Sequence, residues 1–238
     1  MALKQIEIIS LVSILLFNNS ISTNDFDKWC YNRSKAEIGE KNNEVKTPWL
    51  VYLKVTDHSE KSISACGASI IAENWIVTAA HCICNHFDCG NKSRHEIRQI
   101  RVPEENLKMK MGMMDRNLAF LFPDYTSKRV FVHPLYDTSL KTSPNDIALI
   151  QTEQNIPFEK GKISPICMAS KLPNHPLNNL KVTGWGATSD PKCLTKVGSP
   201  SLLQECQVIF AFLNIFDLNL LCAFFWTVSI YVQESNFS

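Results

Sequence analysis

The amino-acid sequence predicts an all-β protein. Short apolar runs rich in Val, Ile and Thr recur along the chain, turn residues (Pro, Asn, Asp, Gly) separate them, and no long amphipathic helix interrupts them. The length of 238 residues fits one large β domain or two small ones. The runs cover residues 49–55, 68–72, 75–80, 129–133, 146–151 and 181–185. This pattern is typical of a β-sandwich or a β-barrel.

The charge balance excludes one class of partner. The chain carries 24 Lys+Arg against 23 Asp+Glu, a net charge of +1, whereas a nucleic-acid binder usually has a basic excess or a basic stripe. Hydrophobic residues make up 45% and charged residues 20%, which is the composition of a folded globular protein. We therefore expect no nucleic-acid partner.

The N-terminal segment has the features of a secretory signal peptide. Lys4 precedes an apolar run over residues 8–17, and Ser20 and Ser22 supply small residues before a cleavage site. The apolar run is too short to span a bilayer. We predict that residues 1–22 are a signal peptide and that the protein is secreted. Beyond the signal peptide, three Asn-x-Ser sequons, at Asn32, Asn91 and Asn236, are candidate glycosylation sites in that compartment.

Nine cysteines also indicate an oxidising compartment. The odd count leaves at least one cysteine unpaired or bonded to another chain. Cys84 and Cys89 lie in a dense Cys/His segment (residues 82–89) that could bind zinc, but in a secreted chain a local Cys84–Cys89 disulfide is favoured. Cys193 and Cys206 form a further candidate pair, which leaves Cys222 over.

Two separated segments carry candidate catalytic groups. Cys66 and Cys82 flank an apolar hairpin, so a disulfide between them would hold its ends together and place His81 at a strand end. An imidazole that titrates near neutral pH suits general-base chemistry. Downstream, Asp146 begins a buried strand, where its carboxylate needs hydrogen-bond donors, and a histidine N–H is one.

Three motifs together resemble the chymotrypsin/trypsin-like serine proteases. They are CGASIIAENWIVTAAHC (66–82), HPLYD followed by NDIALI (133–150), and VTGWG (182–186), in the order of that family. The resemblance implies two β-barrels with the active site between them, His81 as the general base and Asp146 as its orienting partner. It implies protein substrates or protease inhibitors as partners. We expect neither a cofactor nor a metal, because no residues are present that match the usual Ca²⁺ site of the family.

The resemblance also implies a pro-segment over residues 23–35. Lys35–Ala36 falls at the activation cleavage position, although Ala36-Glu37-Ile38-Gly39 stands where the family usually has Ile-Val-Gly-Gly. Cys30 resembles the pro-segment cysteine of some members, and Cys167 resembles its usual partner. A Cys30–Cys167 bridge would keep the leader attached after cleavage.

The nucleophile motif of the family is missing. The family serine lies in Gly-Asp-Ser-Gly-Gly, but the last glycine here is Gly198. We therefore expect a partial protease domain over residues 36–206, with an incomplete second barrel, and an apolar tail over residues 207–238 that does not match the family. A retained intron, an alternative exon or a gene-model error would produce such a tail.

The sequence thus predicts a secreted serine endopeptidase by family, with a Ser-His-Asp mechanism, that is inactive as written. Two alternatives remain open. One is a non-catalytic secreted homologue that acts as a binding module. The other is a membrane-tethered form held by residues 208–232, where Asp217 near the centre of the span would be costly.

Overall fold

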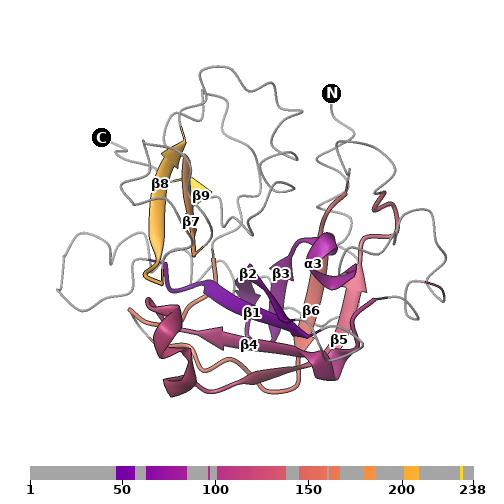
Figure 1. The fold of residues 1–238 in the computed structure, drawn as a ribbon, viewed down its shortest axis with the longest axis horizontal. Coiled ribbons are helices and arrows are strands. Elements are labelled where there is room, and N and C mark those ends of the chain that lie inside the picture. The colour runs from indigo at the N-terminus through magenta and orange to yellow at the C-terminus, as the bar shows by residue number, and fades with distance from the viewer. Residues whose placement is uncertain are drawn as a thin grey trace.

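Strands dominate the architecture of the chain (Figure 1). The computed structural model describes residues 47–56, 63–84, 96, 101–137, 145–159, 161–166, 180–185, 201–208 and 231–232. Its helices are the short α3 (Ala80–Cys84) and the 3-10 turns η1 (Glu104–Asn106) and η2 (Arg116–Leu121). Its strands are β1 (Leu50–Thr56), β2 (Ile63–Ala72), β3 (Trp75–Thr78), β4 (Leu107–Met111), β5 (Tyr125–Val132), β6 (Ala148–Thr152), β7 (Leu180–Gly184), β8 (Gln204–Val208) and β9 (Tyr231–Val232). The predicted all-β class is confirmed.

The first six strands form a closed barrel in the order β1-β2-β3-β6-β5-β4. Every neighbouring pair is antiparallel, and pairing of β1 with β4 closes the ring. Closure leaves no unpaired strand edge in this sheet.

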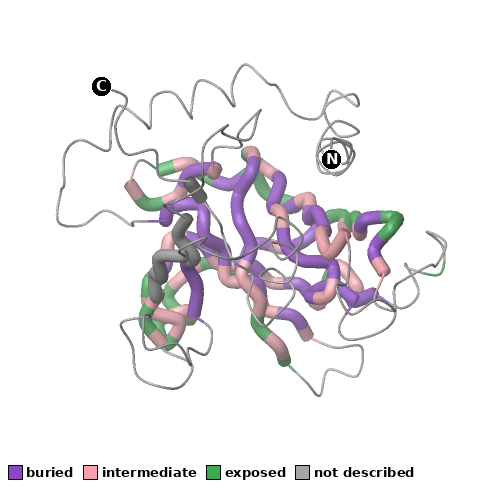
Figure 2. Tube along the Cα trace, turned by 90° about the horizontal axis from the view of Figure 1, so that it is seen from above, coloured by how far each residue is buried: buried purple, intermediate pink, exposed green. Residues whose placement is uncertain are grey.

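The barrel core follows from the alternation of side chains along each strand. In β1 and β4 every second residue is buried, so hydrophobic side chains point inward and polar ones outward. Figure 2 shows the buried segments running through the middle of the molecule. The fully buried core side chains include Val51, Leu53, Val55, Ile70, Ile76, Leu107, Met109 and Ile150.

Five of the barrel strands coincide with runs predicted from the sequence, but β4 does not. Its sequence, LKMKM, alternates apolar residues with Lys108 and Lys110, so it has no continuous apolar run. Lys110 turns outward, where its ammonium lies 2.8 Å from the Asp124 carboxylate. A period of two, not the local hydrophobicity, is the signal for this strand.

A second, three-stranded sheet has the order β8-β7-β9 and lies beside the barrel in Figure 1. Trp185, directly after β7, connects it to the barrel. The indole is buried with Leu50 and Met113, packs edge-on against Tyr52 with ring centroids 5.7 Å apart, and donates from Nε1 to the Met114 carbonyl. The predicted incomplete second barrel corresponds to this sheet within the described residues.

The described ends of the segment 208–232 are both strands. Val208 ends β8, Tyr231–Val232 form β9, and both strands pair with β7. Across the portions of the chain that the structure describes, no helix has both the length and the apolar character needed to cross a membrane.

The barrel core predicts a contrast between two isoleucines of β2. Ile70 is 0% exposed and Ile63 is 63% exposed. Ile70→Ala should lower the free energy of unfolding by about 2–5 kcal/mol, because it removes buried methylene groups and leaves a cavity. Ile63→Ala, the matched control, should change it by less than about 0.5 kcal/mol. Urea denaturation followed by tryptophan fluorescence measures both, and equal effects would contradict this packing.

Candidate functional site

The register between β3 and β6 brings His81 and Asp146 together. These strands are antiparallel neighbours, with Thr78 opposite Ala148 at the end of β3 and the beginning of β6. His81 follows β3 by three residues and Asp146 precedes β6 by two. Both residues therefore lie at the same end of the barrel, although they are 65 residues apart in the sequence.

His81 lies on a short helix, not at the end of a strand as predicted. β3 ends at Thr78, and Ala80–Cys84 form one helical turn, α3, in which Ala80, Cys82 and Ile83 are buried. The small residues Ala79 and Ala80 allow this turn to pack against the barrel core. The helix turns the imidazole outward, so the His81 side chain is 28% exposed.

The Asp146 carboxylate binds His81 through both of its oxygens. Oδ1 accepts a hydrogen bond from the His81 backbone N–H at 2.8 Å, and Oδ2 lies 2.7 Å from the ring nitrogen Nδ1. The first contact satisfies an N–H in the first turn of α3 that has no partner within the helix. The Asp146 side chain is only 4% exposed, so these two bonds supply the partners that a buried carboxylate requires.

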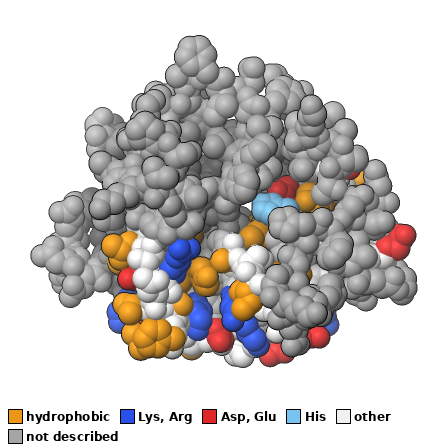
Figure 3. Space-filling model, in the orientation of Figure 1, with side chains coloured by type: hydrophobic (Ala, Val, Ile, Leu, Met, Phe, Trp, Pro, Cys, Tyr) orange, Lys and Arg blue, Asp and Glu red, His pale blue; other side chains and the backbone are white. Residues whose placement is uncertain are grey.

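This geometry fixes the orientation of the imidazole. Because Oδ2 can only accept when Asp146 is ionised, Nδ1 carries the proton and the neutral ring presents its lone pair at Nε2. Figure 3 shows a histidine side chain reaching the surface beside an acidic one. The arrangement can take a proton at Nε2 while the adjacent carboxylate stabilises the resulting positive ring.

Sequence reasoning assigned no role to Asn145, the residue that orients Asp146. Asn145 adopts a φ of 61°, in the left-handed region that Asn tolerates better than most residues. Its carboxamide donates to the Leu135 carbonyl at 2.7 Å, and the Ile147 N–H donates back to the Asn145 carbonyl at 2.7 Å. Asp146 is thus held at the centre of a tight turn. The Asn-Asp dipeptide was the available signal.

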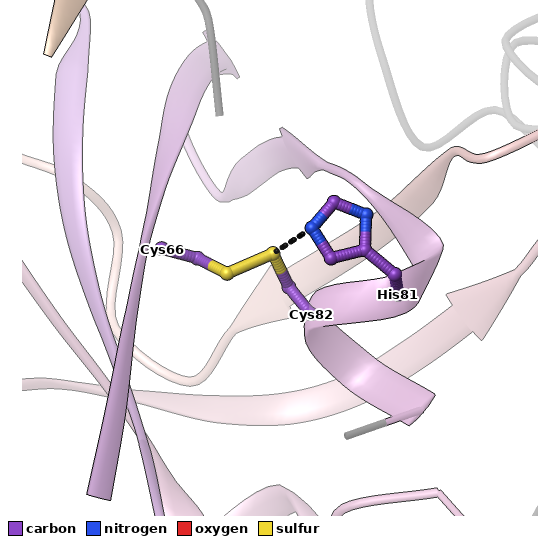
Figure 4. Close-up of side chains that lie close together, drawn as sticks. All are labelled: Cys66, His81 and Cys82. Atoms are coloured by element: carbon purple, nitrogen blue, oxygen red, sulfur yellow. Dashed lines mark hydrogen bonds between the residues drawn. A yellow bond between two sulfur atoms is a disulfide. The ribbon is translucent and has the colours of Figure 1, made fainter. Parts of the chain in front are cut away.

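A disulfide joins Cys66 on β2 to Cys82 on α3, with Cα atoms 6.3 Å apart. Figure 4 shows the His81 ring beside this bridge, with Nε2 directed at Cys82. Nε2 lies 3.5 Å from Cys82 Sγ. Among the described residues, Cys66, His81 and Cys82 bring three ligand-type atoms within 4.8 Å of one another, but the disulfide leaves neither sulfur as a thiolate that could bind a metal. Cys84 is also disulfide-bonded.

Several predicted site residues have no described side chain. Cys206 lies in β8, which is described as a strand only. The others lie outside the described residues; they are Cys30, Asn32, Lys35, Ala36, Cys89, Asn91, Cys167, Cys193 and Asn236. The predicted pairs Cys30–Cys167, Cys84–Cys89 and Cys193–Cys206, the activation cleavage and the glycosylation sites therefore remain predictions.

Comparison with known proteins agrees with the motifs. The trypsin family model matches residues 38–210. Phenoloxidase-activating factor 3 of Holotrichia diomphalia is 29% identical over 197 residues, covering 78% of this chain and 53% of that protein. Human chymotrypsin-like elastase family member 3A is 32% identical over 180 residues, covering 75% of this chain and 58% of that protein.

A third relative, the serine proteinase stubble of Drosophila melanogaster, is 33% identical over 162 residues, covering 68% of this chain and 18% of that protein. The chain spans about half the length of the first of these relatives. The family match covers most of the chain, and the six-stranded barrel carries the matched His and Asp motifs. The chain therefore belongs to the family of trypsin-like serine proteases.

Proposed function

We propose that His81 and Asp146 are the general base and its orienting partner in the site of a secreted serine endopeptidase, and that the polypeptide of these 238 residues does not itself hydrolyse peptide bonds. The observation that carries the first part is the 2.7 Å contact between His81 Nδ1 and Asp146 Oδ2. In the mechanism of this family, a serine hydroxyl loses its proton to the histidine as it attacks the peptide carbonyl.

The charges and exposure of the pair suit this role. The ionised carboxylate of Asp146 is buried and faces the imidazole, so it favours the protonated ring that forms when His81 takes a proton. The His81 side chain is 28% exposed, so the imidazole is not enclosed in the barrel core. Protein substrates and protease inhibitors are the partners that the family membership supports.

The proposed lack of activity rests on the missing nucleophile. After Ser201 the serines are Ser229, Ser235 and Ser238, and no glycine follows Gly198. The family builds its oxyanion hole from backbone N–H groups on a tight glycine-containing turn around the serine. Without the nucleophile a site of this kind retains only the residual catalysis of the oxyanion hole and of substrate binding, and here the glycines of that hole are absent as well.

Secretion is proposed from the N-terminal features and the cysteines. Residues 1–22 serve as the signal peptide and 23–35 as the pro-segment, followed by the protease domain over 36–206 and the tail over 207–238. The Cys66–Cys82 disulfide and the disulfide-bonded Cys84 support an oxidising compartment. No metal or cofactor enters this proposal.

A non-catalytic binding module is the second candidate, and exposed apolar side chains favour it. In η2, Phe120 is 76% exposed and Leu121 is 65% exposed, and Leu202, which bridges to Asp115 beside this turn, is also exposed. Apolar side chains clustered at the surface are typical of sites that bind other proteins. A membrane-tethered form through residues 208–232 has less support, because both described ends of that segment are strands on β7.

The turn at Asn145 predicts a rank order of stability. Asn145→Ala and Asn145→Gly both remove the hydrogen bond to Leu135, but only alanine is strained at a φ of 61°. The free energy of unfolding of the alanine variant should therefore be about 1 kcal/mol lower than that of the glycine variant. Chemical denaturation of the two variants measures this difference, and an alanine variant as stable as the glycine variant would show that the left-handed turn is absent.

An active-site probe tests the proposed lack of activity. A fluorophosphonate, which labels the activated serine of this family, should not label the purified 238-residue chain. A trypsin with an intact triad is the positive control, and His81→Ala is the matched variant. Labelling of the wild-type chain that His81→Ala abolishes would overturn the proposal, because it would reveal a serine activated by this histidine.

Peptide mapping of the secreted protein tests its processing and its tail. We expect the secreted chain to begin at Thr23, because cleavage after Ser22 fits the signal-peptide pattern. Tandem mass spectrometry should also find peptides that continue from Glu205 into residues 208–238. Peptides that instead continue from Glu205 into a Gly-Asp-Ser-Gly-Gly segment would mean that the natural protein is a complete protease, and they would overturn the non-catalytic candidate.

A further inference from the structure

The HPLYD segment, residues 133–137, begins with a tight turn directly after β5. The strand ends at Val132, and the Tyr136 N–H donates to the His133 carbonyl at 3.0 Å, which closes a turn of four residues. Pro134 occupies the second position of this turn, where its fixed φ favours the conformation. The segment belongs to one of the motifs shared with the family, yet the proposed base and its partner do not include it.

The pairing of β5 with β6 places this turn beside Asp146. Val132 pairs with Ala148, the first residue of β6. The pairing continues one residue beyond both strands, because the His133 N–H donates to the Ile147 carbonyl at 3.0 Å. The first residue of the turn therefore holds the chain directly after Asp146.

The turn also holds the residue directly before Asp146. The Asn145 carboxamide donates to the Leu135 carbonyl at 2.7 Å. This carbonyl belongs to the peptide group that joins Leu135 to Tyr136, and the N–H of the same group donates to the His133 carbonyl. Closing the turn therefore fixes the acceptor that Asn145 requires.

The His133 side chain stabilises the turn from within. His133 is buried, 5% exposed, and its ring nitrogen Nδ1 accepts a hydrogen bond from the Leu135 N–H at 3.1 Å. Asn and Asp side chains make the same kind of bond to the backbone two residues on when they stabilise turns. Because Nδ1 accepts, it carries no proton, and the proton of the neutral ring is on Nε2. His81 has the opposite tautomer, since its Nδ1 donates to Asp146.

We propose that His133 is a positioning residue for the pair formed by His81 and Asp146. Its backbone N–H holds residue 147, and its Nδ1 holds the turn whose carbonyl accepts from Asn145. Asp146 is thus fixed through both of its neighbours in the chain, and it in turn orients the His81 ring. This inference rests on the first part of the proposed function, the pairing of His81 with Asp146, and not on whether the chain carries a nucleophile.

Two amide variants separate the hydrogen bond at Nδ1 from the rest of the ring. In His133→Asn, the side-chain Oδ1 takes the place of Nδ1 and can accept from the Leu135 N–H. In His133→Gln, the amide lies one methylene farther out, in the place of Nε2, so the Leu135 N–H loses its acceptor. Both variants remove the buried ring, and a difference between them therefore reports on the bond at Nδ1.

Proton NMR of the His81 Nδ1–H in the full chain measures the effect. A ring N–H bonded to a carboxylate gives a signal far downfield of the amide protons, and opening of the bond speeds its exchange with water. Wild type and His133→Asn should show this signal with similar exchange rates. In His133→Gln its exchange should be about tenfold faster, because a buried hydrogen bond that fixes the turn is lost. His81→Ala, which lacks the signal, assigns it.

Ring ¹⁵N shifts of the wild-type protein are the second measurement, which does not depend on the stability of any His133 variant. Long-range proton–nitrogen correlation distinguishes the two neutral tautomers of histidine. His133 should carry its proton on Nε2 and His81 should carry its proton on Nδ1. A proton on His133 Nδ1 would overturn the proposal.

The outcomes distinguish this inference from the proposed function. A His81 signal that exchanges equally fast in His133→Asn and His133→Gln would overturn the role of His133 and leave the pair with Asp146 intact. Absence of the signal from folded wild-type protein would contradict that pair, and with it both the first part of the proposed function and this inference.

Discussion

The contact between the Asp146 carboxylate and His81 is the constraint on which the candidate site depends. Two residues that lie 65 positions apart in the sequence must come close enough to form two hydrogen bonds with each other. No local structure can achieve this. The antiparallel pairing of β3 and β6 does, because it puts the end of one strand beside the beginning of the other. The barrel must close for that pairing to be rigid, since β6 is fixed on its other edge by β5.

The same constraint explains how much of the fold and the site could be predicted. Runs of Val, Ile and Leu marked five barrel strands because burial and β propensity coincide in them. The strand β4 was missed because lysines alternate with its core residues. His81 and Asp146 were recognised from their motifs, but their tight pairing was not visible in the sequence, since it depends on the register of distant strands.

Local conformation was harder to predict than the residues that carry the chemistry. The helix that carries His81 is five residues long, Ala80–Cys84, which is too short for a hydrophobic periodicity, and no capping residue in the sequence predicts its start. The left-handed turn at Asn145 depends on the Leu135 carbonyl, ten residues away, as the acceptor for its side chain. Trp185 was recognised only as part of the VTGWG motif. In the structure its indole is buried against Leu50 and Met113 of the first barrel, so its role is in packing.

The arrangement also shows that one barrel positions both His81 and Asp146. His81, Asp146, Asn145 and the Cys66–Cys82 bridge all belong to the closed barrel and its adjoining turns, so their geometry does not depend on a second barrel. The same barrel therefore sets both the orientation of the imidazole and its immediate surroundings. His81 Nε2 lies 3.5 Å from Cys82 Sγ, which the disulfide to Cys66 on β2 holds in place.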